Sequence, residues 1–242
     1  MFAVHEISTG FKTKTKLNEI HTHISFNLNA GSITLLLGAN GIGKSVFFRT
    51  LLNIYKPLNG FVAYNGKNLS DMPNDELASF ISLMLPTPPN IELMSALDIA
   101  MSGRQRFTKS WQLHNDENEA IVNSYFKICN IENLKDKNFE KLSDGEKQKV
   151  MLVRCLAQET PILLLDEPMA FLDYPSRKQF LSLIQKIAQE QGKIIMMSTH
   201  DIDISLPFAN HILAFTKNEY QFFQDPKFFS TELIFSEKAQ SI

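Results

Sequence analysis

The chain has 242 residues, with 44% hydrophobic and 21% charged side chains, which is the composition of an ordinary globular protein. This length suffices for one large domain that buries its own core without staples. The 24 basic and 26 acidic side chains nearly cancel, so the sequence indicates no broad cationic surface and no nucleic-acid partner.

Membrane insertion and disulfide bonding are not expected either. The first ten residues include His5 and Glu6 and lack the apolar core of a signal peptide. The apolar runs are strand-sized, well below the roughly 20 residues that span a bilayer. Cys129 and Cys155 lie far apart, without metal-ligand spacing, and are predicted to be buried thiols in a reducing compartment. We therefore expect a chain that is soluble when isolated.

Short strands separated by turn residues are predicted in the first third of the chain. A helix is predicted from about Lys44 to Ile54, and Pro57 follows its end. The stretch Pro86–Pro89 then breaks regular structure. The predicted strands of this part cover residues 3–7, 24–28, 33–37, 61–64 and 80–85.

Helical patterns follow in the middle of the chain. From Ile91 to Cys129, apolar residues recur at steps of three and four, which predicts helix. A further helix is predicted at about 145–158. The middle of the chain is therefore expected to form a helical insert near residues 87–158.

The last third alternates short apolar strands with amphipathic helices, which indicates a parallel sheet buried on both faces. The strands are predicted at 162–165 and 194–197, a helix at 176–191, and a short helix after Asp201. The Phe-rich tail from Tyr220 to Ile242 is not assigned to elements. It is expected either to pack on the core or to dock a partner.

A phosphate-binding loop is predicted between the strand at 33–37 and the helix that follows. Its glycines let backbone amides point inward at phosphate oxygens, and the helix directs its positive end to the same place. Lys44 is expected to reach the β- and γ-phosphates, and the Ser45 hydroxyl to bind Mg²⁺. An ordinary glycine-rich turn is the alternative, but the four fixed positions arise by chance in roughly one such chain in a hundred. The predicted nucleotide-binding residues here are Gly38, Ala39, Asn40, Gly41, Ile42, Gly43, Lys44 and Ser45, with the amide of Val46.

Two acids end the apolar strand at 162–165. Because ligands gather at the carboxyl ends of parallel strands, Asp166 is expected to lie beside the phosphate loop and to hold Mg²⁺. Glu167 is one residue further and faces differently, so it is predicted to polarise water for attack on the γ-phosphate. Taken alone, such acids more often cap a turn or helix. Their pairing with a phosphate loop favours the functional interpretation.

The segment Leu142-Ser143-Asp144-Gly145-Glu146-Lys147-Gln148 resembles the signature motif of ATP-binding-cassette (ABC) ATPases, usually written LSGGQ. Ser143 and the Gly145 amide stand at a predicted helix start, which makes an anion-binding end. Ser143 with Glu146 is also a capping box, and that role is compatible with the first. In the family this motif serves the ATP of a partner subunit, so the resemblance implies two chains that sandwich two nucleotides.

Three further positions match the family in order, and the resemblance covers roughly residues 1–220. Phe11 stands where the family has an aromatic that stacks on adenine, although an ordinary core or surface Phe is nearly as common. Asp173 ends a segment that matches the D-loop. His200 follows the strand at 194–197 as the family's switch histidine does, where a neutral imidazole can bind the γ-phosphate and hold Glu167 and water in line.

The resemblance implies a fold class: a P-loop NTPase (RecA-like) α/β core with an N-terminal antiparallel β-subdomain and a helical subdomain. The whole chain, residues 1–242, is expected to be one domain. Its core is expected at 1–86 and 159–220, its helical subdomain at about 87–158 and a tail at 221–242.

The resemblance also implies the chemistry and the partners. ATP and Mg²⁺ are the expected cofactors, and ATP hydrolysis is expected to drive a membrane transporter. The expected partners are a second copy of the chain, an integral membrane permease and a substrate-binding protein. The expected place is the cytoplasmic face of the cell membrane, as a peripheral subunit.

Three positions depart from the family pattern. Met84-Leu85-Pro86-Thr87 lacks the usual Gln after its strand, so either Thr87 substitutes weakly or the loop serves coupling alone. Val46 replaces a usual Thr. Asp144 adds a negative charge near a phosphate site, which is expected to weaken ATP attraction and slow hydrolysis.

Met101-Ser102-Gly103-Arg104 and the signature segment resemble the importer branch that takes up iron–siderophore complexes, haem or cobalamin. Three other interpretations stay open: a non-transport ABC ATPase acting on a soluble partner, a P-loop kinase or G protein, and a degenerate nucleotide sensor. The signature motif and the acid pair argue against a kinase or G protein.

Overall fold

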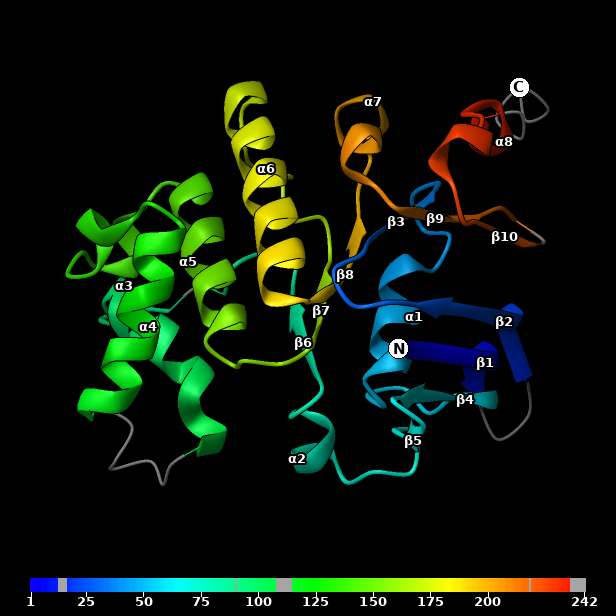
Figure 1. Cartoon of the computed structure of the whole chain (residues 1–242), viewed down its shortest axis with the longest axis horizontal. Coiled ribbons are helices and arrows are strands. Elements are labelled where there is room, and N and C mark those ends of the chain that lie inside the picture. The colour runs from blue at the N-terminus through cyan, green and yellow to red at the C-terminus, as the bar shows by residue number, and fades with distance from the viewer. Residues whose placement is uncertain (13–16, 90, 108–114, 218, 236–242) are drawn as a thin grey trace.

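The computed structural model describes residues 1–12, 17–89, 91–107, 115–217 and 219–235. Two sheets and a group of helices make up this part of the chain (Figure 1). The helices α3, α4 and α5 gather at one end, and the antiparallel strands lie at the other, with the larger sheet between them. This is the α/β architecture that the sequence predicts.

The smaller sheet is antiparallel, in the order β2-β1-β4-β5. Asn65 (φ 48°) and Gly66 (φ 80°) both take the left-handed conformation that a tight β4–β5 hairpin requires. The first two strands of this sheet are longer than the predicted strands at 3–7 and 24–28. Their pairing continues past register shifts between Val4 and Gly10 as far as the pair Lys12 and Leu17. The strands are β1 (Phe2–Lys12), β2 (Leu17–Leu28), β4 (Asn59–Tyr64) and β5 (Lys67–Asn68).

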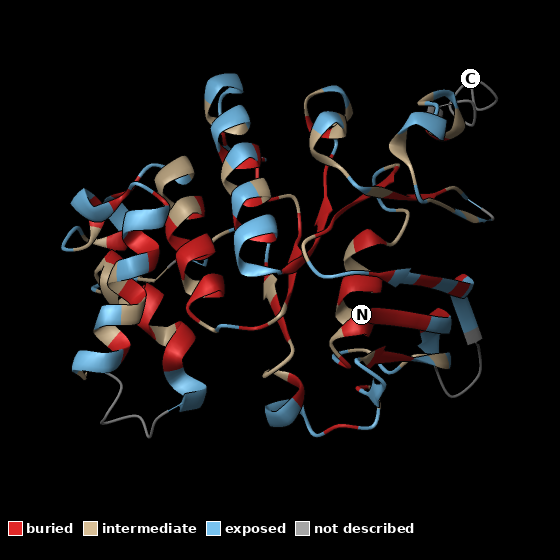
Figure 2. Cartoon of the chain, in the orientation of Figure 1, coloured by how far each residue is buried: buried red, intermediate tan, exposed pale blue. Residues whose placement is uncertain are grey.

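The larger sheet has the order β10-β9-β3-β8-β7-β6, parallel from β9 to β6 with β10 antiparallel at its edge. Every residue of β3, β7 and β8 is buried, as short apolar strands covered on both faces predict (Figure 2). Its strands are β3 (Ile33–Gly38), β6 (Ile81–Met84), β7 (Ile162–Leu165), β8 (Ile194–Ser198), β9 (His211–Phe215) and β10 (Tyr220–Phe223).

Side chains of this sheet alternate between two apolar clusters. Leu35 and Leu37 of β3 belong to the cluster that includes α3, α4, α5 and α6, whereas Leu36 belongs to the cluster beneath α1 and the antiparallel sheet. This alternation is the two-residue period of a strand. The helices outside the insert are α1 (Lys44–Leu51), α2 (Asn74–Leu77), α6 (Tyr174–Gln191), α7 (Ile202–Ser205) and α8 (Glu232–Phe235).

The first helix is shorter than predicted. It ends at Leu51 rather than near Ile54, because Asn53 takes a left-handed φ of 55°. The Asn53 side chain donates hydrogen bonds to the carbonyls of Leu69 (3.2 Å) and Ser70 (2.9 Å), which fix that conformation. The helix end is therefore set by a contact with a distant segment.

The helical insert lies between β6 and β7 and contains α3 (Ala96–Met101), α4 (Asp116–Ile128) and α5 (Asp144–Leu156). The expectation of helix throughout Ile91–Cys129 is wrong for 91–95. Ser95 caps α3 in a capping box with Asp98, and the helix begins only after it. Residues 108–114 of the same expectation lie outside the described residues.

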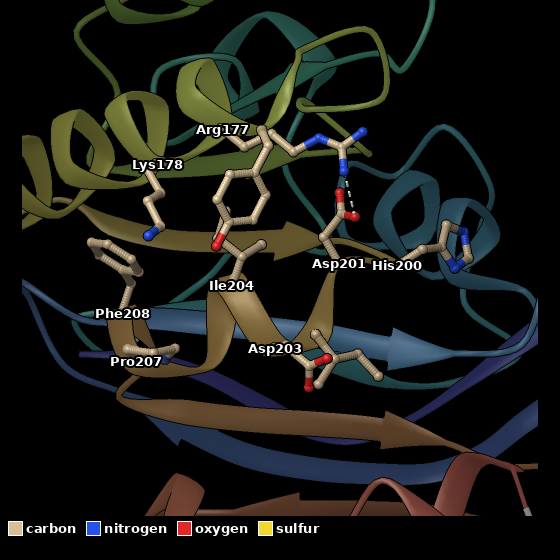
Figure 3. Close-up of a pocket in the computed structure, with 10 residues that line it drawn as sticks. Arg177, Lys178, His200, Asp201, Asp203, Ile204, Pro207 and Phe208 are labelled. Atoms are coloured by element: carbon tan, nitrogen blue, oxygen red, sulfur yellow. Dashed lines mark hydrogen bonds and ion pairs between the residues drawn. The ribbon is translucent and has the colours of Figure 1, made fainter.

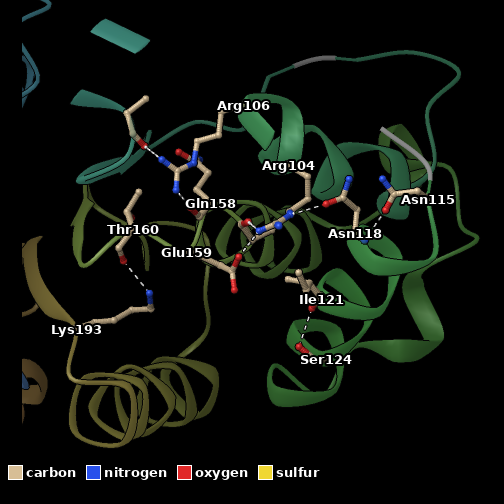
Figure 4. A network of polar contacts seen from close by, with 12 residues as sticks. Arg104, Arg106, Asn115, Asn118, Ile121, Ser124, Gln158, Glu159, Thr160 and Lys193 are labelled. Carbon is tan, nitrogen blue, oxygen red and sulfur yellow. Dashed lines mark hydrogen bonds and ion pairs between the residues drawn. The ribbon is translucent and has the colours of Figure 1, made fainter. Parts of the chain in front are cut away.

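A buried arginine connects this insert to the sheet (Figure 4). Arg104 is 4% exposed and lies in a 3₁₀ segment, Ser102–Phe107, which follows α3. It donates to Asn118 Oδ1 of α4 at 3.0 Å and to the Ala157 carbonyl at 2.9 Å, and it forms an ion pair with Glu159. Residues of two insert segments are thereby fixed to the chain that leads into β7.

Candidate functional site

The carboxyl ends of β3, β7 and β8 bring the phosphate loop, the acid pair and His200 together. The phosphate loop follows β3, and α1 begins at Lys44, directly after Gly43 with φ 108°. A Cβ on Gly43 would lie 2.6 Å from Ile20 Cγ2 and 2.8 Å from His21 Cε1, so β2 leaves no room for a side chain there. Glycine is thus required both by the backbone angle and by the neighbouring strand.

The loop encloses a cavity of about 210 Å³ at the start of α1. Backbone amides at a helix start, together with the helix dipole, favour a bound phosphate group. The structure adds Glu167, from the end of β7, to the wall of this cavity. The complete lining is Ala39, Asn40, Gly41, Ile42, Gly43, Lys44, Ser45, Val46 and Glu167.

Lys44 is 6% exposed, and its ammonium donates to the carbonyls of Gly38 at 2.8 Å and Ala39 at 3.3 Å. Burial lowers the pKa of Lys44, while the nearby charges of Glu167 and Asp166 act in the opposite direction. The cation is therefore held by the loop carbonyls at the wall of the cavity, where the charges of two carboxylates act on it.

Asp166 is buried at 3% exposure, and its Oδ1 accepts a hydrogen bond from Ser198 Oγ at 2.6 Å. The same Ser198 oxygen accepts the Glu167 backbone N–H at 2.8 Å. Ser198 thus connects the ends of β7 and β8 and orients both acids. The sequence interpretation did not include it among the site residues, although a Ser ending an otherwise apolar strand beside the acids is a signal that could have found it.

Glu167 has a backbone φ of 48°, in the left-handed region that residues other than glycine seldom adopt. Its Oε1 lies 2.6 Å from His200 Nε2, and both side chains are partly open to solvent. A carboxylate held by an imidazole at the wall of a phosphate-sized cavity can accept a proton from a water molecule. The two predicted catalytic residues are thus in direct contact.

The loop that carries His200 is supported by α6. Asp201 Oδ1 forms an ion pair with Arg177 Nη1 at 2.7 Å, and Asp201 points toward that guanidinium while His200 points away from it (Figure 3). Arg177 also donates to the Leu172 carbonyl at 2.8 Å, which lies next to Asp173. The D-loop segment and the histidine loop therefore share one arginine.

The signature segment begins α5 as predicted. The Ser143 side chain accepts the Glu146 N–H at 3.3 Å, and the Glu146 carboxylate accepts the Ser143 N–H at 2.9 Å. The latter bond lowers the pKa of Glu146. Ser143 and Asp144 are exposed. Neither Ser143 nor Gly145 lines the phosphate-loop cavity of its own chain.

Phe11 and Asp173 also lie outside that cavity. Phe11 is 39% exposed on β1 and packs edge-on against Tyr55, with ring centroids 5.2 Å apart. Asp173 is the N-cap of α6 and accepts the Ser176 N–H at 2.9 Å. Hydrogen bonds to Ser176 lower the pKa of Asp173.

The loop after β6, where the family usually has a Gln, contacts α5. Gln148 is fully buried, and its Nε2 donates to the Pro86 carbonyl at 2.7 Å. The loop after β6 is thereby fixed to the signature helix. Gln148 is the last residue of the signature segment, and the sequence alone did not predict a role for its side chain.

Ser45 and Asp166 offer the oxygen donors that Mg²⁺ prefers, a hydroxyl at the cavity wall and a buried carboxylate. Among the described residues, no cluster of three or more His, Cys, Asp or Glu side chains could hold a metal by itself. This donor set suits a Mg²⁺ ion that takes most of its ligands from water and from the phosphates of a nucleotide.

The fold and the site define a P-loop nucleotide-binding ATPase: a parallel sheet, a glycine-rich loop at a helix start, and a carboxylate pair at the neighbouring strand end. Residues 21–170, more than half of the chain, match the ABC transporter family, and the chain belongs to that family. It is an ATP-binding subunit of an ABC transporter.

Several relatives were found by sequence. An uncharacterized ABC transporter ATP-binding protein of Methanocaldococcus jannaschii is 35% identical over 195 residues, which cover 81% of this chain and 67% of that protein. The iron(3+)-hydroxamate import ATP-binding protein FhuC of Bacillus subtilis is 29% identical, over 80% of this chain and 72% of that protein. The achromobactin transport ATP-binding protein CbrD of Dickeya dadantii is 28% identical, over 86% and 76%.

Solved structures agree with this fold. A metal-chelate type ABC transporter in an inward-facing conformation superposes with a TM-score of 0.83 over 97% of this chain and 87% of that chain, at 24% identity. CbiO1 of Clostridium perfringens superposes with a TM-score of 0.79 over 98% and 91%, at 26% identity. No helix in the described part of the chain is both long enough and apolar enough to cross a membrane.

Proposed function

We propose that this chain energises an importer of iron–siderophore type by hydrolysing ATP in a sandwich of two copies. One observation carries the catalytic part of the proposal: Glu167 lines the phosphate-loop cavity and lies 2.6 Å from His200. A general base held by a second group beside a phosphate site is the arrangement that water-dependent cleavage of a γ-phosphate requires.

In the proposed mechanism the amides of Gly41–Ser45 hold the β- and γ-phosphates. The Lys44 ammonium moves from the carbonyls of Gly38 and Ala39 to the phosphate oxygens, where it offsets negative charge. Glu167 accepts a proton from the attacking water. His200 keeps that carboxylate in line, and its Nε2–H is shared between Glu167 and a γ-phosphate oxygen when the nucleotide is bound.

Ser45 and Asp166 are the residues proposed to hold Mg²⁺, and Ser198 keeps Asp166 oriented for that purpose. A Mg²⁺ ion held by these residues would supply positive charge that offsets the negative charge of the phosphates in the transition state. Phe11 is proposed to stack on adenine; its exposure and its edge-on packing against Tyr55 support an accessible ring.

A second copy is proposed to close the site. Ser143 and the Gly145 amide lie at the exposed start of α5 and outside the cavity of their own chain, which supports a role toward the nucleotide of the other copy. Asp173 is proposed to lie at the same interface. ATP then stabilises the closed dimer over the open one, and its hydrolysis removes that difference.

The remaining partners are an integral membrane permease and a substrate-binding protein. The proposed place is the cytoplasmic face of the cell membrane. Relatives that are ATP-binding proteins of a siderophore transport system, of iron(3+)-hydroxamate import and of petrobactin import support the iron–siderophore substrate class over haem or cobalamin. Movement is proposed to reach the permease through the helical subdomain, residues 87–158, and the loop that Gln148 fixes at Pro86.

The test of transport is affinity purification of the tagged chain from native membranes, with identification of the bound proteins. We expect the bound proteins to include a permease and a substrate-binding protein of an iron–siderophore importer. Recovery of a soluble complex with no membrane protein would support the non-transport alternative instead. The untagged strain is the control for proteins that bind the resin.

The test of the nucleotide site is Lys44→Ala. The variant is expected to bind Mg-ATP at least tenfold more weakly, because a charge-assisted hydrogen bond to phosphate is worth about 1.5–3 kcal/mol. Titration calorimetry of the parent and the variant measures this, and Lys186→Ala on the exposed face of α6 is the matched control. Equal affinity of Lys44→Ala and the parent would rule out the proposed phosphate site.

A further inference from the structure

The Phe-rich C-terminal segment returns across the sheet to the nucleotide site. After β10, the Asp225 side chain accepts the Lys227 N–H at 3.0 Å and turns the chain. Phe229 then packs edge-on against Phe223, with ring centroids 5.6 Å apart. This turn directs the last described helix, α8, back over the sheet edge (Figure 1).

Ile234 of α8 is the anchor of this segment. It is 8% exposed and belongs to the same apolar cluster as Leu35, Leu37 and Ile212 of strands β3 and β9. It also lines a small cavity of about 70 Å³ that contains both the start of the phosphate loop and the histidine loop. The other residues around that cavity are Gly38, Ala39, Asn40, Thr199, His200 and Ile202.

The histidine loop is therefore supported from two sides. On one side, the Asp201–Arg177 ion pair at 2.7 Å fixes it to α6, and the Asp201 N–H donates to Thr199 Oγ1 at 3.0 Å. On the other side, Ile234 lines the same small cavity as Thr199, His200 and residues 38–40. Removing an apolar side chain from such a place leaves space into which the loop can shift.

The phosphate loop does not depend on Ile234 in the same way. Its later residues are fixed by their own backbone, since the Phe47 N–H donates to the Gly43 carbonyl at 2.9 Å and the Ile42 N–H donates to the Ala39 carbonyl at 3.3 Å. The loop is further fixed by Lys44, which donates to the Gly38 carbonyl. A change at Ile234 should thus displace His200 more than it displaces the amides that grip phosphate.

We propose that Ile234 is a positioning residue for ATP hydrolysis: the C-terminal segment acts as a brace that keeps His200 in contact with Glu167. This inference rests on the proposed function, because it assumes the roles of Glu167 and His200. It assigns the tail a place in the hydrolytic reaction in addition to its place in the core.

The test compares Ile234→Asp with the conservative Ile234→Val in the full chain. Ile234→Asp is expected to lower kcat about tenfold while KM for ATP changes less than about twofold, because misplacing a catalytic group by a fraction of an ångström slows the chemical step. Ile234→Val, which keeps an apolar branched side chain, is expected to have the parental kcat. Phe228→Ser is the matched control on the same segment, since Phe228 is 79% exposed, and it should behave as the parent.

A role in stability alone would lower the amount of folded protein without separating kcat from KM. The proposal is therefore wrong if kcat per folded molecule of Ile234→Asp equals that of the parent, or if KM rises in proportion as kcat falls. If Ile234→Asp does not fold, Ile234→Ala, which removes the contact without adding charge, is judged by the same criterion.

His200→Ala separates this inference from the proposed function. A loss of kcat in His200→Ala with parental kcat in Ile234→Asp overturns the brace alone. Parental kcat in His200→Ala overturns the brace together with the proposed role of His200, because the brace would then have nothing to position.

Discussion

Glu167 combines an uncommon backbone angle with the central contact of the site. Its φ of 48° places the residue where only surrounding structure can hold it, and the Ser198 hydroxyl that accepts its N–H is part of that structure. The same hydroxyl holds Asp166. One serine thus positions the proposed general base and the proposed metal ligand together.

Glu167→Gln keeps the shape of this residue and removes its basicity. ATP turnover is expected to fall about 10²–10⁴-fold, the usual cost of losing a general base. Steady-state phosphate release by parent and variant measures this. Retained turnover would exclude Glu167 as the base, whereas absence of turnover in the parent itself would support a nucleotide sensor.

His21 predicts a dependence of stability on pH. It is 6% exposed, its ring centroid lies 3.8 Å from that of Phe215, and its Nδ1 forms a hydrogen bond with Thr9 Oγ1 at 3.1 Å. Burial lowers the pKa of His21 to about 4 from 6.5, against an opposing contribution from the Ile42 backbone. The unfolded chain therefore takes up a proton at a higher pH than the folded chain does.

Because the unfolded state binds more protons between pH 6.5 and about 4, stability should fall as pH falls through that window. The loss from this group is about 2 kcal/mol by about pH 5, at 1.36 kcal/mol for each unit of pKa difference. Urea unfolding at about pH 7.5 and about pH 5, repeated on His21→Leu, measures this. The variant should lose less stability between the two conditions; equal losses would exclude His21 as the cause.

At the scale of elements, α5 carries a charge that opposes the proposed ligand. Asp144 is exposed at the first position of the helix, and Lys147 Nζ lies 3.9 Å from its Oδ1, too far for more than partial compensation. A negative charge at a helix start stabilises the helix but repels a nucleotide held by that same end.

Asp144→Asn removes the charge and keeps the size of the side chain. KM for ATP is expected to fall about two- to fivefold, since a charge at a helix end is worth 0.3–1 kcal/mol. The effect should shrink at high salt, because exposed charges are screened. ATPase assays at low and high ionic strength measure it, with Asp116→Asn at the start of α4 as control; a KM that does not change at low salt would count against the proposed role of the α5 start.

At the scale of the whole molecule, the proposed sandwich predicts dimerisation that depends on ATP. Glu167→Gln binds but does not cleave ATP in this scheme, so saturating ATP should trap two copies together. Light scattering coupled to gel filtration, with and without ATP, measures the mass. A persistent monomer at high protein concentration would contradict the sandwich. Adding Lys44→Ala to the same variant is the control, since it should remain monomeric.

The sequence by itself determined the strands and helices whose period is strict and whose ends carry local signals. The strand at 162–165 was predicted with its observed bounds, and the capping box at Ser143 fixed the start of α5 within one residue. The phosphate loop was predicted from fixed residue types at fixed intervals between a strand and a helix, and the acid pair from its place at the end of a buried strand.

Only the tertiary structure decided the elements and contacts that depend on distant segments. Strand β9 and the edge strand β10 were not predicted, and α1 ends early because Asn53 bonds to residues beyond the next strand. Three contacts near the site join segments that are far apart along the chain. Ser198 accepts the Glu167 N–H, Gln148 donates to the Pro86 carbonyl, and Ile234 lines a cavity beside the histidine loop. Such contacts leave no local period in the sequence, because the packing that creates them is long-range.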